Sequence, residues 1–420
     1  MRVELINTGT ELVLGDTVNT NAAWLGQRLA GLGLAVARQT VVPDGAVIAE
    51  VLAEAAARAD IVVVTGGLGP TNDDITREVT AQLLGLELQE SAAVMEHLDA
   101  YFRQRGRTVN AATRLQAMVP EGGVVLPNRQ GTAPGLYLAA GLGTGRAADC
   151  HFFLLPGPPR ELKPMMEQEV EPLLCRLVPA AGTRVVRYLK TTGLGESDLV
   201  DRIQADLEAR ADQGLELGYC LGRGDVDVRL AGPAEVVEEA AEWVRQRLGP
   251  LVFSEDRRVL EEVVVDLLRE RGQWVATAES CTGGLIACRI TDVSGASAVL
   301  GRGWVTYSNE AKTAELGVPA DLISLHGAVS AEVVQAMAEG ARQMADADHG
   351  LAVTGIAGPT GGTEEKPVGT VFVGLASRGE PVCSAKLFFP GARDRFKLLT
   401  SQAALDMLRR RLLGVSLNEI

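Results

Sequence analysis

A hydroxyl-rich turn, TAESCTGG at Thr277–Gly284, stands between a predicted strand and a predicted helix. Trp274–Thr277 is a short apolar run typical of a buried strand, and Leu285–Ile290 is predicted to be helical. Loops that follow strands are where α/β sheets bind ligands, and the first turn of a helix offers N–H groups to an anion. Ser280 in this turn could act as a nucleophile. Equally, Ser280 and Thr282 could only cap the helix.

Three later loops supply the groups that a lone serine lacks. Lys312 follows a predicted strand at Gly303–Tyr307, the glycine-rich loop Gly355–Gly362 follows another at Gly350–Thr354, and Arg393 follows the last one. A serine, a lysine, an anion-binding loop and an arginine suit acyl transfer on a substrate that carries a phosphate. The chain has four histidines and no G-x-S-x-G motif, so a Ser–Lys dyad is favoured over a Ser–His–Asp triad.

Cys281 is a rival nucleophile next to Ser280. Neighbouring residues point in different directions, so only one of the two can face the substrate. Backbone N–H groups near Thr282–Gly284 are expected to hold the oxyanion. Lys312 must lose its proton to act as a base, through desolvation or through a nearby cation such as Arg393.

The N-terminal part has loops rich in carboxylates and glycines. Glycines in TGGLGPTNDDIT, Thr65–Thr76, let the backbone approach a ligand and expose N–H groups to an anion. Asp73 and Asp74 supply oxygen ligands suited to Mg²⁺ or Mn²⁺. Alternatively, one of these aspartates caps a helix and the glycines only make the turn. A third loop places Glu161 near the start of a helix, where a carboxylate is stabilised.

Alternating strands and helices must position these loops. Such alternation over residues 1 to about 165 predicts a parallel, doubly wound sheet. The strands Ile61–Val64 and Phe152–Leu155 are apolar throughout, as expected when both faces of a sheet are covered. A smaller α/β unit and a second α/β domain follow along the chain. The predicted domains span residues 1–177, 178–254 and 255–420.

Composition excludes several classes of protein. The chain has 420 residues, 46% of them hydrophobic, which suits two or three soluble domains, and no apolar run is long enough for a membrane span. A net charge of −14 and 4% aromatic residues argue against stable nucleic-acid binding. Six scattered cysteines without a CxxC pair indicate neither a disulfide framework nor a zinc site. The N-terminus enters a strand without an apolar signal segment, so a cytoplasmic protein is expected.

The motifs GTELVLG with NTN, TGGLGPTNDDIT and LPGPPREL resemble the molybdopterin-binding-like domain of the CinA (competence/damage-inducible) family. This resemblance implies a metal-dependent ADP-ribose pyrophosphatase that uses Mg, Mn or Co. It implies metal ligands at Glu11, Asp73, Asp74 and Glu161. It implies substrate contacts at Asn21, Gly66, Gly67, Gly69 and Thr71. Family members usually have Val and Met where this chain has Pro158 and Leu162.

The segments TAESCTGG, VTYSNEAK, HGAVS, VTGIAGPTGGTEEKPVGT and FPGARD resemble the nicotinamide mononucleotide amidohydrolase domain of the same family. The resemblance implies Ser280 as nucleophile, Lys312 as its base and Tyr307 as a further catalytic residue, with no cofactor. It implies substrate contacts at Thr282, Gly283, Gly284, Thr354, Gly355 and Arg393. Relatives usually have Asp where this chain has Ala392.

Together these resemblances imply a homodimeric, bifunctional enzyme of pyridine-nucleotide recycling. It would convert nicotinamide mononucleotide to nicotinate mononucleotide and ammonia, and it would hydrolyse ADP-ribose. The middle domain resembles a KH-type module, but its loop Gly193–Asp198 carries two acids and no base, so a spacer or dimerisation role is favoured over nucleic-acid binding. One alternative is a nucleotide- or pterin-binding adaptor in competence or DNA-damage response. Another is a molybdenum-cofactor transferase in the N-terminal domain.

Overall fold

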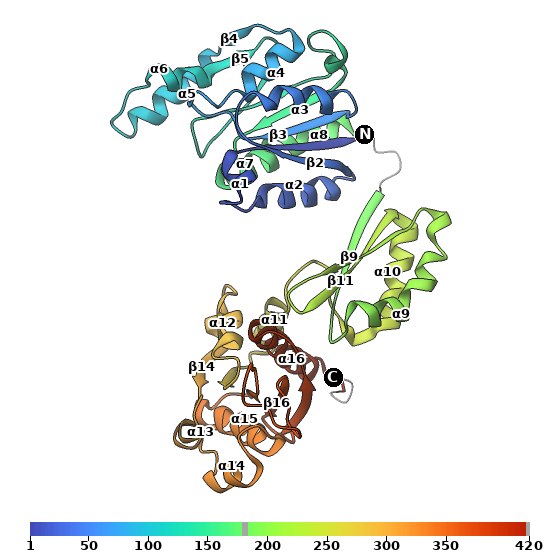
Figure 1. Cartoon of the computed structure of the whole chain (residues 1–420), viewed down its shortest axis with the longest axis vertical. Coiled ribbons are helices and arrows are strands. Elements are labelled where there is room, and N and C mark those ends of the chain that lie inside the picture. The colour runs from blue at the N-terminus through green and yellow to red at the C-terminus, as the bar shows by residue number, and fades with distance from the viewer. Residues whose placement is uncertain (179–183, 417–420) are drawn as a thin grey trace. The chain divides into compact units, whose positions relative to one another are not determined.

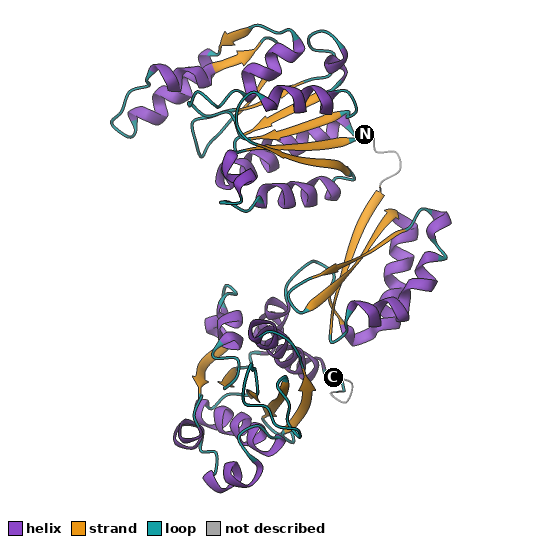
Figure 2. Ribbon diagram, viewed as in Figure 1, coloured by secondary structure: helices purple, strands orange, loops and turns teal. Residues whose placement is uncertain are grey.

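The computed structural model describes residues 1–178 and 184–416. The chain forms two compact units, Met1–Val185 and Val186–Ile420 (Figure 1). Parts of the expected domains 178–254 and 255–420 lie outside the described residues. The mixed α/β architecture expected from the sequence is confirmed in all three domains (Figure 2). No helix among the described residues is long and apolar enough to cross a membrane.

A six-stranded sheet of order β2-β1-β3-β8-β7-β6 forms the centre of the first unit. Its strands are β1 (Val3–Thr8), β2 (Val36–Val42), β3 (Ile61–Thr65), β6 (Val124–Leu126), β7 (Gly135–Leu138) and β8 (His151–Leu155). The first three and β8 are parallel, as predicted, whereas β6 and β7 add an antiparallel edge. The connections flanking β7 contain no α-helix, and a parallel crossover normally needs one.

Helices cover both faces of this sheet. They are α1 (Thr10–Leu14), α2 (Thr20–Gly31), α3 (Val47–Ala56), α4 (Thr76–Leu84), α5 (Ala92–Arg103), α6 (Ala111–Arg114), α7 (Pro159–Met165) and α8 (Glu171–Leu177). Ile6 of β1 packs into a core with residues of α3, α4 and α5, while its neighbour Leu5 packs into a second core with residues of α2, α7 and α8. Alternate side chains therefore face opposite layers, which explains why the strand is apolar throughout. A two-stranded sheet, β4 (Leu88–Glu90) with β5 (Met118–Pro120), completes the unit.

The middle domain has a four-stranded sheet of order β10-β11-β9-β12. Its elements are β9 (Arg184–Thr192), α9 (Glu196–Glu208), β10 (Glu216–Leu221), β11 (Asp225–Pro233), α10 (Ala234–Leu248) and β12 (Val252–Ser254). In α9 the buried residues Leu199, Ile203 and Leu207 recur every four positions, so one stripe of the helix packs inward.

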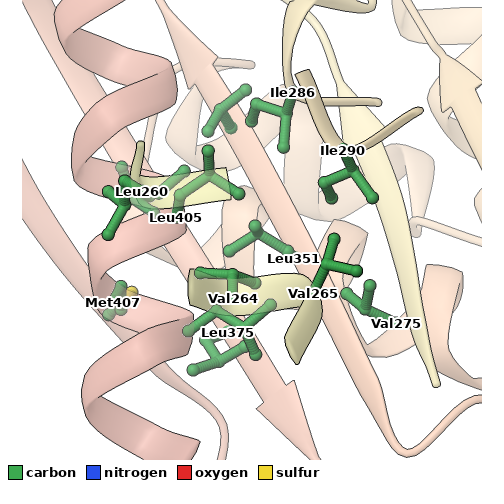
Figure 3. Close-up of a cluster of buried hydrophobic side chains, with 14 of the residues drawn as sticks. Leu260, Val264, Val265, Val275, Ile286, Ile290, Leu351, Leu375, Leu405 and Met407 are labelled. Carbon is green, nitrogen blue, oxygen red and sulfur yellow. The ribbon is translucent and has the colours of Figure 1, made fainter. Parts of the chain in front are cut away.

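The C-terminal domain is a five-stranded sheet of order β14-β13-β15-β16-β17 between two layers of helices. The strands are β13 (Val275–Glu279), β14 (Leu300–Val305), β15 (His349–Gly355), β16 (Thr370–Ser377) and β17 (Cys383–Phe388). The helices are α11 (Leu260–Arg271), α12 (Leu285–Thr291), α13 (Asn309–Leu316), α14 (Ala320–His326), α15 (Ala331–Ala345) and α16 (Arg393–Leu413). Figure 3 shows the core under α11 and α16, where Leu260 and Leu405 meet sheet residues such as Leu351.

Strand direction brings the candidate loops of this domain to one edge. The strands β13, β14 and β15 are parallel, so Ser280 and the segments after Val305 and Gly355 leave the sheet at the same end. β16 runs antiparallel to β15, and β17 antiparallel to β16, which returns the end of β17 to that edge. Arg393 at the start of α16 therefore joins the same group of loops.

Candidate active sites

Ser280 follows the last residue of β13 at the carboxyl edge of the sheet. Its N–H donates to Val353 O of the neighbouring strand at 3.1 Å, which fixes the backbone beside β15. The side chain lies at the limit of burial, with 9% of its surface exposed. Ser280 does not cap α12, because the capping position belongs to Gly284 and no side chain caps it in that way.

Lys312 is the partner of this serine. Lys312 Nζ lies 3.2 Å from Ser280 Oγ and donates to Thr306 O at 2.9 Å, with longer contacts to Tyr307 O at 3.4 Å and Ser308 O at 3.5 Å. The residue is 1% exposed. Ser308 positions it by capping α13, since Ser308 Oγ accepts from Ala311 N at 3.1 Å and starts the helix that carries Lys312.

Burial is the main influence on the lysine amine. Desolvation lowers the pKa of Lys312 below its usual 10.5, while Cys281 and Glu310 oppose the shift. Arg393 had been considered as a cation that could lower this pKa, but it is not among the causes. No carboxylate forms an ion pair with Nζ among the residues that the structure describes, so a buried ammonium would have only neutral oxygens as hydrogen-bond partners there.

Cys281 points into the hydrophobic core instead of the site. It is 5% exposed and packs among the residues beneath α11 and α16. Burial raises the pKa of its thiol to about 12, so the thiol remains protonated at neutral pH. Since the thiolate is the nucleophilic form, the geometry favours Ser280 over Cys281.

Glu279 is a site residue that sequence reasoning missed. Its carboxylate is fully buried and accepts four hydrogen bonds. Thr282 Oγ1 is one donor, at 2.6 Å, so this hydroxyl is directed at Glu279, and the residue is 0% exposed. Gly284 N is another, at 3.0 Å, and it therefore cannot serve as the expected oxyanion donor. Of the turn residues 281–283, Cys281 and Thr282 are buried and Gly283 is exposed.

Tyr307 and Arg393 form the outer part of the site. Arg393 Nη2 donates to Tyr307 Oη at 2.9 Å, and Nη1 donates to Gly358 O at 3.0 Å in the glycine-rich loop. Tyr307 is 63% exposed, so the pair lies at the solvent side of the buried lysine. Thr354 Oγ1 donates to Ala328 O at 2.8 Å, which anchors the start of that loop. At Gly355 a Cβ would lie 2.8 Å from Thr370 O, so the position requires glycine.

The N-terminal candidates line one pocket of about 520 Å³. All the residues that were expected to bind metal or substrate in this domain line the pocket: Glu11, Asn21, Gly66, Gly67, Gly69, Thr71, Asp73, Asp74 and Glu161. Gly66 and Gly67 both have positive φ, at 97° and 67°, which is the conformation that glycine permits. The structure thus gathers residues that are up to 150 positions apart in the sequence.

Some of these carboxylates already have protein donors. Asp74 accepts from Thr71 N at 2.9 Å and from Thr71 Oγ1, and it does not cap α4. Glu161 Oε2 accepts from Asn128 Nδ2 at 2.8 Å. Sequence reasoning missed three polar residues here: Asn128, the pocket-lining Asp44, which accepts from Thr10 N at 2.9 Å, and the pocket-lining Gln116. They lie far along the chain from the glycine loop, so no local spacing links them to it.

The carboxylates of this pocket suit a metal ion that takes only one or two of its ligands from the protein. No group of three or more His, Cys, Asp or Glu side chains could hold a metal among the residues that the structure describes. Mg²⁺, however, commonly binds through one or two carboxylates and takes its other ligands from water and substrate phosphates. Exposed Glu11 and Asp73, facing the same pocket as the glycines, suit that mode.

Comparisons with known proteins cover almost the whole chain. Residues 4–176 match the family model described as "Probable molybdopterin binding domain", residues 186–254 the "Damage-inducible protein CinA KH domain", and residues 257–412 the "CinA C-terminal domain". A "CinA-like protein" of Akkermansia muciniphila is 49% identical over 405 residues, covering 96% of each chain. The chain belongs to the CinA family.

Two further proteins with CinA-type names are similar to this chain. A "CinA-like protein" of Geobacter sulfurreducens is 44% identical over 424 residues, covering 98% of this chain and 100% of the relative. The crystal structure of "competence/damage inducible protein CihA" from Agrobacterium tumefaciens is 43% identical and covers 36% of this chain and 91% of its own, with a TM-score of 0.35.

Pro158 and Ala392, where the resemblance leads us to expect Val and Asp, both lie immediately before a helix. Pro158 precedes the first residue of α7 in extended conformation and is followed by Pro159, which the first turn of a helix accepts. Ala392 occupies the N-cap of α16 and makes no side-chain cap hydrogen bond. An aspartate there would be a favourable cap, so this chain forgoes that stabilisation of the helix that carries Arg393.

Proposed function

We propose that the C-terminal domain hydrolyses the carboxamide of nicotinamide mononucleotide to a carboxylate and ammonia. The observation that carries this proposal is the buried Lys312 amine 3.2 Å from Ser280 Oγ. In a neutral amine, two N–H groups satisfy nearby carbonyl oxygens such as Thr306 O, and the lone pair is free to accept the serine proton. A Ser–Lys pair of this kind activates a hydroxyl without histidine.

The reaction then proceeds in two halves. Ser280 Oγ gives its proton to Lys312 and attacks the carboxamide carbon, and backbone N–H groups of the turn after Ser280 stabilise the oxyanion. The tetrahedral intermediate expels ammonia, which takes the proton back from Lys312. Water, deprotonated by the same amine, hydrolyses the acyl ester and restores Ser280. Arg393, tied to the loop Gly355–Gly362 through Gly358 O, would hold the substrate phosphate.

Ammonia release from nicotinamide mononucleotide by the purified chain tests this function. Catalytic turnover by the wild type and its loss in Ser280→Ala are expected, with the variant's thermal unfolding unchanged. An adaptor that only binds nucleotides or pterins would give binding without turnover, which would overturn the proposal.

We further propose that the N-terminal pocket hydrolyses the pyrophosphate of ADP-ribose. Its support is one pocket that is lined by glycines and by several carboxylates. Glu11 and Asp73 are the residues that would hold a divalent cation together with the phosphates. Asp74 and Glu161, which accept from Thr71 and Asn128, line the pocket beside them. Such a cation would neutralise phosphate charge, while the glycine loop and Asn21 would orient the substrate.

Chelation separates the two proposed activities. EDTA should abolish ADP-ribose hydrolysis and leave deamidation unchanged, and Asp73→Asn should impair only the former. If both reactions continued equally well in EDTA, the proposed requirement for a divalent cation would be wrong. Binding of molybdopterin without consumption of ADP-ribose would favour a cofactor transferase instead.

A further inference from the structure

The carboxylate of Glu279 organises the turn that presents Ser280. Glu279 is the last residue of β13 and is 0% exposed. Its Oε2 accepts from Thr282 Oγ1 at 2.6 Å, Gly284 N at 3.0 Å and Ile286 N at 3.1 Å, and its Oε1 accepts from Ala287 N at 2.9 Å. The side chain at the start of the turn is therefore hydrogen-bonded both to the middle of the turn and to the first residues of α12.

Neutral donors, not a cation, stabilise this buried charge. No Lys, Arg or His forms an ion pair with Glu279 among the described residues. Backbone N–H groups at the start of α12 take that place, helped by the positive end of the helix. A buried carboxylate would cost several kcal/mol without such donors, so the charge and the conformation of the turn depend on each other.

The backbone of the turn is shaped around the carboxylate. Gly283 and Gly284 have φ of 63° and 94°, which lets the chain turn back so that Thr282 and Gly284 both donate inward. Ser280, held on one side by Val353 O, is then held on the other by a turn fixed to Glu279. The direction of Ser280 Oγ toward Lys312 follows from these two constraints.

We propose that Glu279 is the positioning residue of the nucleophile: its four-hydrogen-bond cap on the turn orients Ser280 Oγ toward Lys312 without touching the substrate. This rests on the proposed deamidation. Removing the cap should lower the rate of attack by Ser280, while substrate affinity and the ionisation of Lys312 stay the same.

Glu279→Gln is the informative variant, because it preserves the shape of the side chain. A glutamine can keep three bonds by placing its carbonyl oxygen at the Oε2 position. Its amide N–H₂ then faces Ala287 N–H, so one bond is lost and two donors oppose each other. We expect kcat to fall about 10- to 100-fold, the cost of a small displacement of a catalytic group. KM should change less than about threefold, and the pH at half-maximal kcat should not move.

Two comparisons separate positioning from general destabilisation. Asp406→Asn removes another buried carboxylate, which pairs with Arg409 and Arg410 on α16, and it should lower thermal stability while kcat is retained. Thr282→Val removes one donor to Glu279 and should lower kcat, and Thr282→Ser, which keeps the hydroxyl, should recover most of it.

A second readout does not depend on the substrate. The rate at which a sulfonyl fluoride modifies Ser280, mapped by mass spectrometry, should fall in Glu279→Gln and stay at the wild-type value in Asp406→Asn. If wild type is modified but releases no ammonia, and Glu279→Gln is modified more slowly, the deamidation is wrong and the positioning role stands. The positioning role would be overturned if Glu279→Gln were modified and turned over at wild-type rates. It would also be overturned if kcat of this variant no longer rose with pH. Wild type that is neither modified nor active would overturn both.

Discussion

At the scale of residues, the C-terminal site depends on a lysine that the protein keeps out of water. Lys312 is 1% exposed and bonds to backbone carbonyl oxygens and Ser280, none of which carries a charge. Such surroundings favour the neutral amine, since an ammonium ion would lose its hydration without gaining a counter-ion. The same burial that makes this lysine costly to the fold would suit it to act as the base in the proposed deamidation.

Deamidation should therefore increase with pH through an ionisation below that of free lysine. Desolvation lowers the pKa of Lys312 from 10.5, so its neutral fraction rises at a lower pH than it does for an exposed amine. Initial rates of ammonia release between pH 6 and 10 measure this, with the N-terminal reaction as an internal control. A rate that rises only near the pKa of free lysine would contradict a tuned base.

The neighbouring thiol should be dispensable. Cys281 lies in the core and its pKa is raised to about 12, so Cys281→Ala should deamidate within about threefold of wild type. The loss of buried volume should lower the unfolding temperature. Ser280→Ala, measured in parallel, should be inactive. An inactive Cys281→Ala variant beside an active Ser280→Ala variant would show that Cys281 is the nucleophile.

The sequence was sufficient to predict the site residues on loops after strands. It was not sufficient to predict a residue whose role depends on the folded conformation of its turn. Ser280, Lys312 and Arg393 could be placed together because their strands end at one edge of a sheet. Glu279 could not, since an acid at the end of a strand usually faces water. Its burial depends on donors from the following helix, which only the folded turn provides.

At the scale of elements, long apolar periodic segments were predictable and short polar ones were not. The ends of the predicted strands and helices fall within a few residues of the observed ones. Helix α1, Thr10–Leu14, is five residues long and has no buried residue, so the sequence contains no hydrophobic period that would predict it. The antiparallel edge of the first sheet was also missed, because strand direction depends on the connections rather than on the strands themselves.

His349 at the start of β15 should give the C-terminal domain an acid-sensitive stability. His349 bonds to Ser377 Oγ at 2.9 Å and Gln273 Oε1 at 3.2 Å, and burial lowers its pKa from 6.5 to about 4. Protonation therefore favours the unfolded chain: the contribution is complete above pH 6.5 and is lost as pH falls toward 4. The loss should be about 2 kcal/mol at pH 5.

Urea unfolding of the C-terminal domain at pH 7 and pH 5 measures this contribution. His349→Gln, which can keep the hydrogen bond to Gln273 and does not titrate, should lose less stability between these two pH values than wild type does. Equal losses in the two proteins would show that other groups cause the acid sensitivity.

At the scale of the whole molecule, a polar interface joins the middle domain to α16. Gln402 Nε2 donates to Thr192 Oγ1 at 3.3 Å, and Arg409 Nη2 donates to Pro250 O at 2.5 Å. Gln402 also accepts from Arg289 of α12 at 2.7 Å. Water can replace hydrogen bonds of this kind more easily than it can replace apolar contacts.

A fragment covering residues 255–420 should therefore fold and deamidate without the rest of the chain. Its site lies on loops of its own sheet, and water can replace the hydrogen bonds to Thr192 and Pro250 that the cut removes. It should unfold at a lower temperature, since the cut also removes Phe253 from the core. Circular dichroism and ammonia release measure both properties. A folded fragment without activity would show that another part of the chain contributes to the site.

Steady-state ammonia release by Lys312→Arg and Lys312→Met tests the Ser280–Lys312 dyad most directly. Both variants should be inactive, because guanidinium remains protonated at any working pH and methionine has no basic nitrogen. Calorimetric titration should show that both still bind nicotinamide mononucleotide. If Lys312 only paired with the substrate phosphate, arginine would substitute for it and methionine would mainly raise KM. An active Lys312→Arg enzyme would contradict the role of Lys312 as the base.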